Sequence, residues 1–319
     1  MQKVRSPEDV GAPPGFFRSV LLKMDLSGKS VQRRYLLFIL LVAPAFILRI
    51  VTAAYPIFQT IQLSFTNLDL IKNTNEFVGL KNYRSMFVDP GVQGALSFTT
   101  QLVVASTVLD LVIGMLIALL LNASFRGRGF ARTINLIPWA VPTIVAGYVF
   151  RWLLDDQFGL LTTWIFQLSG IHFVAFINVI SARIIVILAY VWKDAPFIAV
   201  IFLAGLQGVP DELYDAAKMD GANAWNRFWL ITIPLIMPLT VTMGMFRLLW
   251  SLGNFDLVFG LTQGGPGVAT SVLALQVFRT GILFFKFGMA SAISIVLLLF
   301  VAVIGFIGLW LFRKTEISY

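Results

Sequence analysis

The chain has 319 residues, of which 58% are hydrophobic and only 13% are charged, a balance far outside the range of soluble globular domains. It has no cysteine and one histidine, His172, which excludes disulfides, thiolate metal sites and metal sites built from several histidines. The formal net charge of +8 does not indicate a nucleic-acid partner, because the basic residues form no nucleic-acid motif and instead follow a membrane topology.

A basic segment, residues 1–34, precedes the first apolar run. Its positive charges are too many and too widely spread for a signal peptide, so we expect it to stay in the cytoplasm. Within residues 15–26, apolar side chains are interspersed with the cations Arg18 and Lys23 in a weakly amphipathic pattern. This pattern fits either an amphipathic helix on the inner leaflet or a disordered basic tail.

Six apolar runs of spanning length follow, since a transmembrane helix needs about 20 residues. They cover residues 35–58, 96–121, 133–154, 178–204, 233–259 and 286–312. Six crossings place both termini and the basic loops on the cytoplasmic side, as the positive-inside rule requires. The sequence therefore predicts an all-α polytopic membrane protein with a six-helix domain at 35–314 and a short tail at 315–319.

The third and fifth runs contain two prolines each, at positions 138 and 142 and at positions 234 and 238. Proline removes a backbone donor, so we expect kinks there, which either line a cavity or serve packing alone. Inverted repeats of interrupted helices are missing from the pattern, which counts against the secondary transporters that use them.

The loop at residues 208–234 falls on the cytoplasmic side and reads as a helix, a glycine turn at Gly221 and a second short helix. Four of its large apolar or aromatic residues are unusual for a free loop: Tyr214, Met219, Trp225 and Phe228. Either they fill a cleft of a partner protein, or the loop packs on its own bundle.

This loop resembles the hallmark of ABC importer inner-membrane permeases: Glu-Ala-Ala, three residues, Gly, nine residues and Ile-x-Leu-Pro. The residues in register are Asp215, Ala216, Ala217, Gly221, Ile231, Ile233 and Pro234, with Asp215 in place of glutamate and Ile233 in place of leucine. The resemblance implies a coupling helix that sits in a groove of an ATPase subunit. Its expected contact residues are Asp215, Ala216, Ala217, Asp220 and Gly221.

Further segments, at residues 77–84, 126–130, 138–142 and 261–266, resemble sugar permeases of the maltose-transporter type, which are type I importers. Membership would imply a multi-pass protein of the bacterial cytoplasmic membrane that is not itself an enzyme. It would also imply a second permease in a heterodimer, two ATPase subunits that bind ATP and Mg, and an extracytoplasmic solute-binding protein. The chain lacks a nucleotide loop, because Gly28-Lys29-Ser30 has Lys23 where the first glycine is required.

Two runs carry polar stripes at helical spacing. The residues are Tyr190, Lys193, Asp194 and Phe197 in the fourth run and Arg247, Trp250, Ser251 and Asn254 in the fifth. An ionisable residue at membrane depth costs about 2.5 to 3.5 kcal/mol, so these stripes are candidates for a substrate site. Aromatic planes and hydrogen-bonding groups suit a sugar, and the family resemblance implies the same two helix faces. The alternative is that the charges pair for packing.

The cations Lys193 and Arg247 favour a substrate with carboxylate or phosphate groups. Within the family, the sequence looks most like permeases for alginate-type uronic-acid oligosaccharides. Uptake of glycerol 3-phosphate, a glycerol phosphodiester or a neutral sugar remains open, and a secondary transporter is the competing class of protein.

Overall fold

The computed structural model describes residues 29–315, which are mostly helical and contain no strand. The stretch at 15–26, expected to be amphipathic or disordered, and residues 316–319 of the tail lie outside this range. The chain divides into two compact units, one ending at Gln59 and the other beginning at Thr60. The all-α class expected from the sequence is confirmed.

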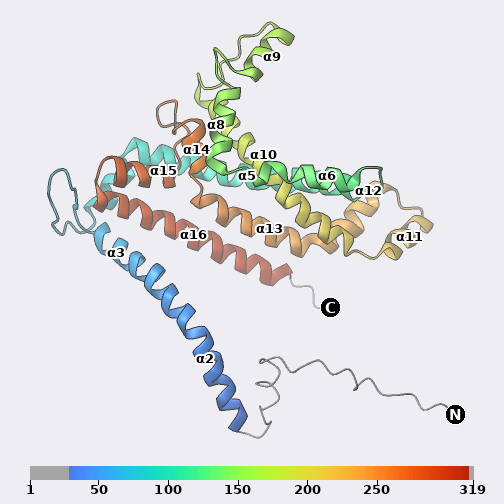
Figure 1. Cartoon of the computed structure of the whole chain (residues 1–319), viewed down its shortest axis with the longest axis horizontal. Coiled ribbons are helices and arrows are strands. Elements are labelled where there is room, and N and C mark those ends of the chain that lie inside the picture. The colour runs from blue at the N-terminus through green and yellow to red at the C-terminus, as the bar shows by residue number, and fades with distance from the viewer. Residues whose placement is uncertain (1–28, 316–319) are drawn as a thin grey trace, which may run out of the picture. The chain divides into compact units, whose positions relative to one another are not determined.

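The helices and three π-helical segments follow one another along the chain (Figure 1). They are α2 (Lys29–Arg49), η1 (Ile50–Ala54), α3 (Tyr55–Ser64), α4 (Lys81–Val88), α5 (Pro90–Asn122), α6 (Arg128–Asn135), α7 (Ile137–Ala140), α8 (Thr143–Leu153), α9 (Leu160–Ser169), α10 (Val179–Gln207), α11 (Asp211–Met219), α12 (Ala224–Arg227), η2 (Phe228–Thr232), α13 (Ile233–Gly253), α14 (Asp256–Leu261), α15 (Leu273–Phe278), η3 (Arg279–Leu283) and α16 (Phe287–Thr315).

Within residues 29–315, five helical stretches are long and apolar enough to cross a membrane: Leu36–Ser64, Pro90–Asn122, Val179–Gln207, Ala224–Gly253 and Phe287–Gly308. A sixth span is possible if the bent pair Arg128–Ala140 and Thr143–Leu153 forms one crossing. The first stretch carries apolar side chains all round, and large ones such as Leu41 and Phe46 are exposed. Such a surface is typical of a helix that meets lipid.

In the second unit, α5, α10, α13 and α16 run alongside one another (Figure 1). The main contact is between α5 and α10, where a side chain on Gly114 would lie 2.8 Å from Ile198 Cγ2. Glycine therefore lets these two helices approach closely. Buried aromatic residues on both helices, Phe98 and Phe202, fill the core on either side of this contact.

The third span was expected over 133–154 with a kink at its prolines, and the structure breaks the helix there. The helical run through α6 and α7 stops at Ala140, and α8 leaves at 92° to it. Val141 is extended (φ −67°, ψ 131°), as the residue before a proline prefers, and Pro142 has no amide to continue the helix. The break places α8 across the other helices (Figure 1).

The fifth span also ends earlier than expected. Its helix stops at Gly253 rather than at 259, because Asn254 is extended (φ −83°, ψ 115°). The separate short helix α14 then begins at Asp256. The helix therefore ends directly before Asn254, the last residue of the predicted polar stripe.

Candidate functional site

A small cavity of about 70 Å³ lies between α7, α10 and α13. It is lined by Trp139, Asp194, Phe197, Ile198, Phe246, Arg247 and Trp250. Four of these come from the two predicted stripes, which the structure brings to one wall. The cavity is therefore the first candidate for a substrate site.

Four aromatic rings form a continuous row along this cavity. Trp139 and Phe197 are stacked, with ring centroids 5.0 Å apart. Phe246 follows 6.5 Å from Phe197, and Trp250 is stacked on Phe246 at 5.6 Å. The Trp139, Phe246 and Trp250 side chains keep about half of their surface exposed, so the row presents ring faces that a ligand can reach.

Beside this row, Arg247 joins three helices through two carboxylates. Its Nε donates to Asp110 Oδ2 on α5, and its Nη2 lies 2.7 Å from Asp194 Oδ2 on α10, an ion pair without hydrogen-bond alignment. Asp110 is fully buried, whereas the Asp194 side chain keeps 14% of its surface exposed. Among the described residues, Arg247 Nη1 has no hydrogen-bond partner.

Sequence reasoning missed Asp110, although the signal was present. It is an acidic residue inside the second apolar run, and the rule applied to Lys193 and Asp194 applies to it equally. The structure shows that Asp194 does pair with another charge, which was the packing alternative for the stripe. The same aspartate nevertheless lines the cavity, so the two interpretations coexist at this residue.

The other four stripe residues are not among those that line the cavity. Tyr190 is buried and its hydroxyl donates to the Asn254 carbonyl at 3.2 Å. Lys193 Nζ donates to the Trp139 carbonyl at 3.2 Å, and Ser251 Oγ donates to Leu248 O at 3.0 Å. In this conformation Tyr190, Lys193 and Ser251 donate to backbone carbonyls, and a direct role with substrate stays a prediction for all four residues.

The second candidate site is the surface of α11, the turn after it and α12. A helix, a left-handed Gly221 (φ 81°) and a second short helix are present, as the sequence predicted. The expected contact residues Asp215, Ala216, Asp220 and Gly221 are exposed, and Ala217 is half-buried. Their exposure leaves them free to meet a second protein.

Large apolar side chains surround that turn. Met219 is 88% exposed and Trp225 is 67% exposed, whereas Phe228 is half-buried. Tyr214 is half-buried as well, and its hydroxyl lies 2.9 Å from Thr232 Oγ1, which ties α11 to η2. One side of the loop thus packs on its own helix bundle, and the other side presents an exposed apolar surface.

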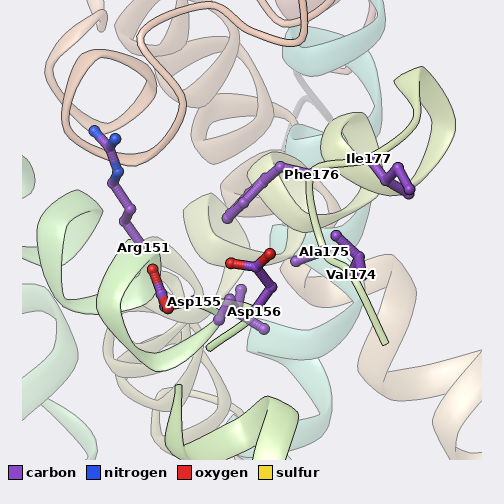
Figure 2. Close-up of a pocket in the computed structure, with 8 residues that line it drawn as sticks. Arg151, Asp155, Asp156, Val174, Ala175, Phe176 and Ile177 are labelled. Atoms are coloured by element: carbon purple, nitrogen blue, oxygen red, sulfur yellow. The ribbon is translucent and has the colours of Figure 1, made fainter. Parts of the chain in front are cut away.

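A third candidate site is a hollow of about 260 Å³ where α8 ends against residues 174–177. Asp155 accepts from the Phe158 and Gln157 amides at 3.0 Å each, which lowers the pKa of its carboxyl below the ordinary value. The Arg151 side chain extends away from Asp155 and Asp156 (Figure 2). With its cation directed elsewhere, this hollow lacks the convergent groups seen around Arg247.

Comparison with known proteins finds one matching family and several similar permeases. The family described as "Binding-protein-dependent transport system inner membrane component" matches residues 110–316. The trehalose/maltose transport system permease protein MalF of Thermococcus litoralis is 35% identical, over 88% of this chain and 95% of that protein. The sulfoquinovosyl glycerol transport system permease protein SmoG of Agrobacterium fabrum is 36% identical, over 82% and 85% respectively.

The fold is shared with a solved structure as well. One chain of a bacterial alginate ABC transporter, in complex with an alginate pentasaccharide-bound periplasmic protein, matches with a TM-score of 0.79. It is 21% identical and the match covers 92% of this chain and all of that one.

Proposed function

Because this chain belongs to the binding-protein-dependent transport system inner membrane components, among the sugar permeases of ABC importers, we propose that its cavity passes an acidic glycoside. The chain is a transport subunit and not an enzyme, and it is a multi-pass protein of the inner membrane. The proposal concerns the chemistry of the substrate and the assembly that moves it.

The aromatic row supports a sugar as substrate. Aromatic faces pack against the apolar faces of sugar rings, and nearby polar groups bind the hydroxyls. Here the row from Trp139 to Trp250 lies beside Asp194 and Arg247 on one wall. The two relatives are transporters of glycosides by name, one of trehalose and maltose and the other of sulfoquinovosyl glycerol.

Arg247 supports an acidic group on that sugar, and this is the single observation that carries the finer proposal. Arg247 lines the cavity, and its Nη1 has no partner among the residues described. A guanidinium binds a carboxylate more strongly than it binds a neutral oxygen. We therefore propose a uronate-type oligosaccharide. A neutral oligosaccharide is the second candidate, since Asp110 and Asp194 already place two carboxylates beside Arg247.

The variant Arg247→Lys tests the charge of the substrate. Lysine keeps a cation for Asp110 and loses the guanidinium fork, so uptake of an acidic substrate should fall roughly tenfold to hundredfold, the size of about 1.5 to 3 kcal/mol. Uptake of a neutral one should change little. The measurement is kcat/KM for uptake into vesicles of a uronic-acid oligosaccharide and of its carboxyl-reduced counterpart.

Phe246→Leu is the matched control, because it shortens the aromatic row and leaves Arg247 in place. It should weaken uptake of both substrates. Equal losses for both substrates in Arg247→Lys would contradict an acidic preference and leave a general sugar permease. Failure of the unmodified transporter to move the acidic probe would also contradict an acidic preference.

The surface formed by α11, the turn after it and α12 supports the assembly proposed here. It combines exposed small residues, Ala216 and Gly221, with exposed Met219 and Trp225. These features suit insertion into a groove of an ATPase subunit, which would bind ATP and Mg in place of this chain. We propose a complex of this permease, a second permease, two ATPase subunits and an extracytoplasmic binding protein that joins transiently.

The isolated chain should therefore show no ATP hydrolysis. Native mass measurement of the detergent-purified complex should give one copy of this chain, one of a second permease and two ATPase subunits. A functional transporter without ATPase subunits, driven by a proton gradient alone, would contradict the proposal and favour a secondary transporter.

A further inference from the structure

The break in the bent span leaves the Trp139 carbonyl without its helical partner. In a continuous α-helix the Thr143 amide would donate to it, but Val141 and Pro142 are extended at this point. Lys193 Nζ donates to this carbonyl at 3.2 Å instead. A cation is the favoured group at the C-terminal end of a helical run, where carbonyl oxygens stay unpaired.

Two further contacts attach the same half of the span to α10. Asn135 Nδ2 donates to Pro196 O at 3.0 Å, and the Phe197 ring is stacked on Trp139. The three contacts on α10 come from positions 193, 196 and 197, little more than one helical turn. The segment α6–α7 is therefore attached to α10 through its backbone, an amide side chain and an aromatic ring.

The other half of the span packs its backbone on α14, and its Phe150 ring also meets Trp192 of α10 edge to face at 5.1 Å between centroids. A side chain on Gly147 of α8 would lie 2.7 Å from Leu257 O, and one on Gly260 of α14 would lie 2.7 Å from Ile144 O. The backbones of α8 and α14 are thus in direct contact, which only glycine at these two positions allows. Along the chain, residues 141–142 join the two halves.

We propose that Lys193 is a positioning residue which makes α6–α7 move as one body with α10, while α8 moves with α14 about a hinge at 140–142. Because α10 leads through residues 208–210 into α11, a movement of α11 would carry Trp139 and so change the shape of the cavity. The inference rests on the proposed coupling role of α11. It does not depend on the charge of the substrate.

Spin labels can test the two bodies directly, because the chain has no cysteine to remove. Labels at Ile134→Cys and Leu188→Cys join α6 to α10, and labels at Ile134→Cys and Trp152→Cys span the hinge. All three positions are exposed. In the complex with its native partners, the first distance should be the same in nucleotide-free and vanadate-trapped states, and the second should change. A change in the first distance, or none in the second, would overturn the inference.

The role of Lys193 is tested with Lys193→Met and Lys193→Arg. Loss of the donor should broaden the 134–188 distance distribution and lower uptake per ATP hydrolysed about tenfold, the scale of one charge-assisted hydrogen bond. Arginine can still donate to the carbonyl and should restore both readouts. Lys286→Met, which removes an exposed cation far along the chain, serves as the control.

The substrate pair separates this inference from the proposed function. A positioning role predicts equal losses for the acidic oligosaccharide and for its carboxyl-reduced form in Lys193→Met. A loss confined to the acidic form would overturn the inference and would make Lys193 a substrate contact, with the acidic preference intact. Unchanged uptake per ATP would overturn it as well.

Discussion

Replacing Arg247 by methionine is expected to prevent the permease from accumulating in its folded form. The change would leave the carboxylate of Asp110, which is fully buried, with no cation beside it. Removing one partner of a buried ion pair costs about 3 to 5 kcal/mol, a large share of the stability of a protein. Loss of the Asp194 ion pair adds to this cost.

Yield of the monodisperse complex and its Tm in detergent measure the effect. The double variant Asp110→Asn with Arg247→Met should recover much of the loss, because no charge remains at the fully buried position. Asp156→Ala, which removes an exposed carboxylate, should leave both quantities unchanged. A single variant Arg247→Met with the yield and Tm of the unmodified chain would contradict the buried network.

Gly221→Val is expected to uncouple transport from ATP hydrolysis. Gly221 has a φ of 81°, and the Ala222 amide after it turns back to bond the Ala217 carbonyl at 2.9 Å. A left-handed conformation costs an L-residue about 1 to 2 kcal/mol, and a β-branched side chain resists it further. Nothing lies within 4 Å of the added Cβ, so the effect would come from the backbone alone.

Substrate-stimulated ATPase activity and uptake in reconstituted vesicles are the readouts. Gly221→Asn should retain most of both, because asparagine tolerates the left-handed region. Gly129→Val, at another open glycine without a positive φ, should behave as the unmodified chain does. If normally inserted Gly221→Val kept stimulated hydrolysis and uptake, α11 would not be the coupling element.

Local patterns predicted part of this structure well. The turn at Gly221 and the helices on either side follow from neighbouring residues, so the sequence was sufficient there. Prolines predicted a kink in the third span, but they could not give the bend of 92° or the direction in which α8 leaves. That direction depends on the packing of α8 against α14 and of α7 against α10, which lie far apart in the sequence.

The cavity shows the same limit. Helical spacing correctly put Asp194 and Phe197 on one face, and likewise Arg247 and Trp250. It could not say which other helix would face them, so Trp139 was missed, and Phe246 lies beside Arg247 on α13 but outside the spacing of the stripe. Periodicity also could not show that Tyr190 and Lys193 would turn to backbone carbonyls, because those carbonyls are freed only by breaks in distant helices.

The formal charges around the cavity have an electrical consequence. Asp110 and Asp194 are balanced by Lys193 and Arg247, so these four groups together carry no net charge. If they move as a set, the membrane potential does no net work on them, whereas it acts on every charge of the cargo. An anion drawn inward against an inside-negative potential costs about 2.3 kcal/mol per charge for each 100 mV. For the acidic glycoside proposed here, the voltage would oppose import, and nucleotide hydrolysis in the partner subunits would have to supply that work.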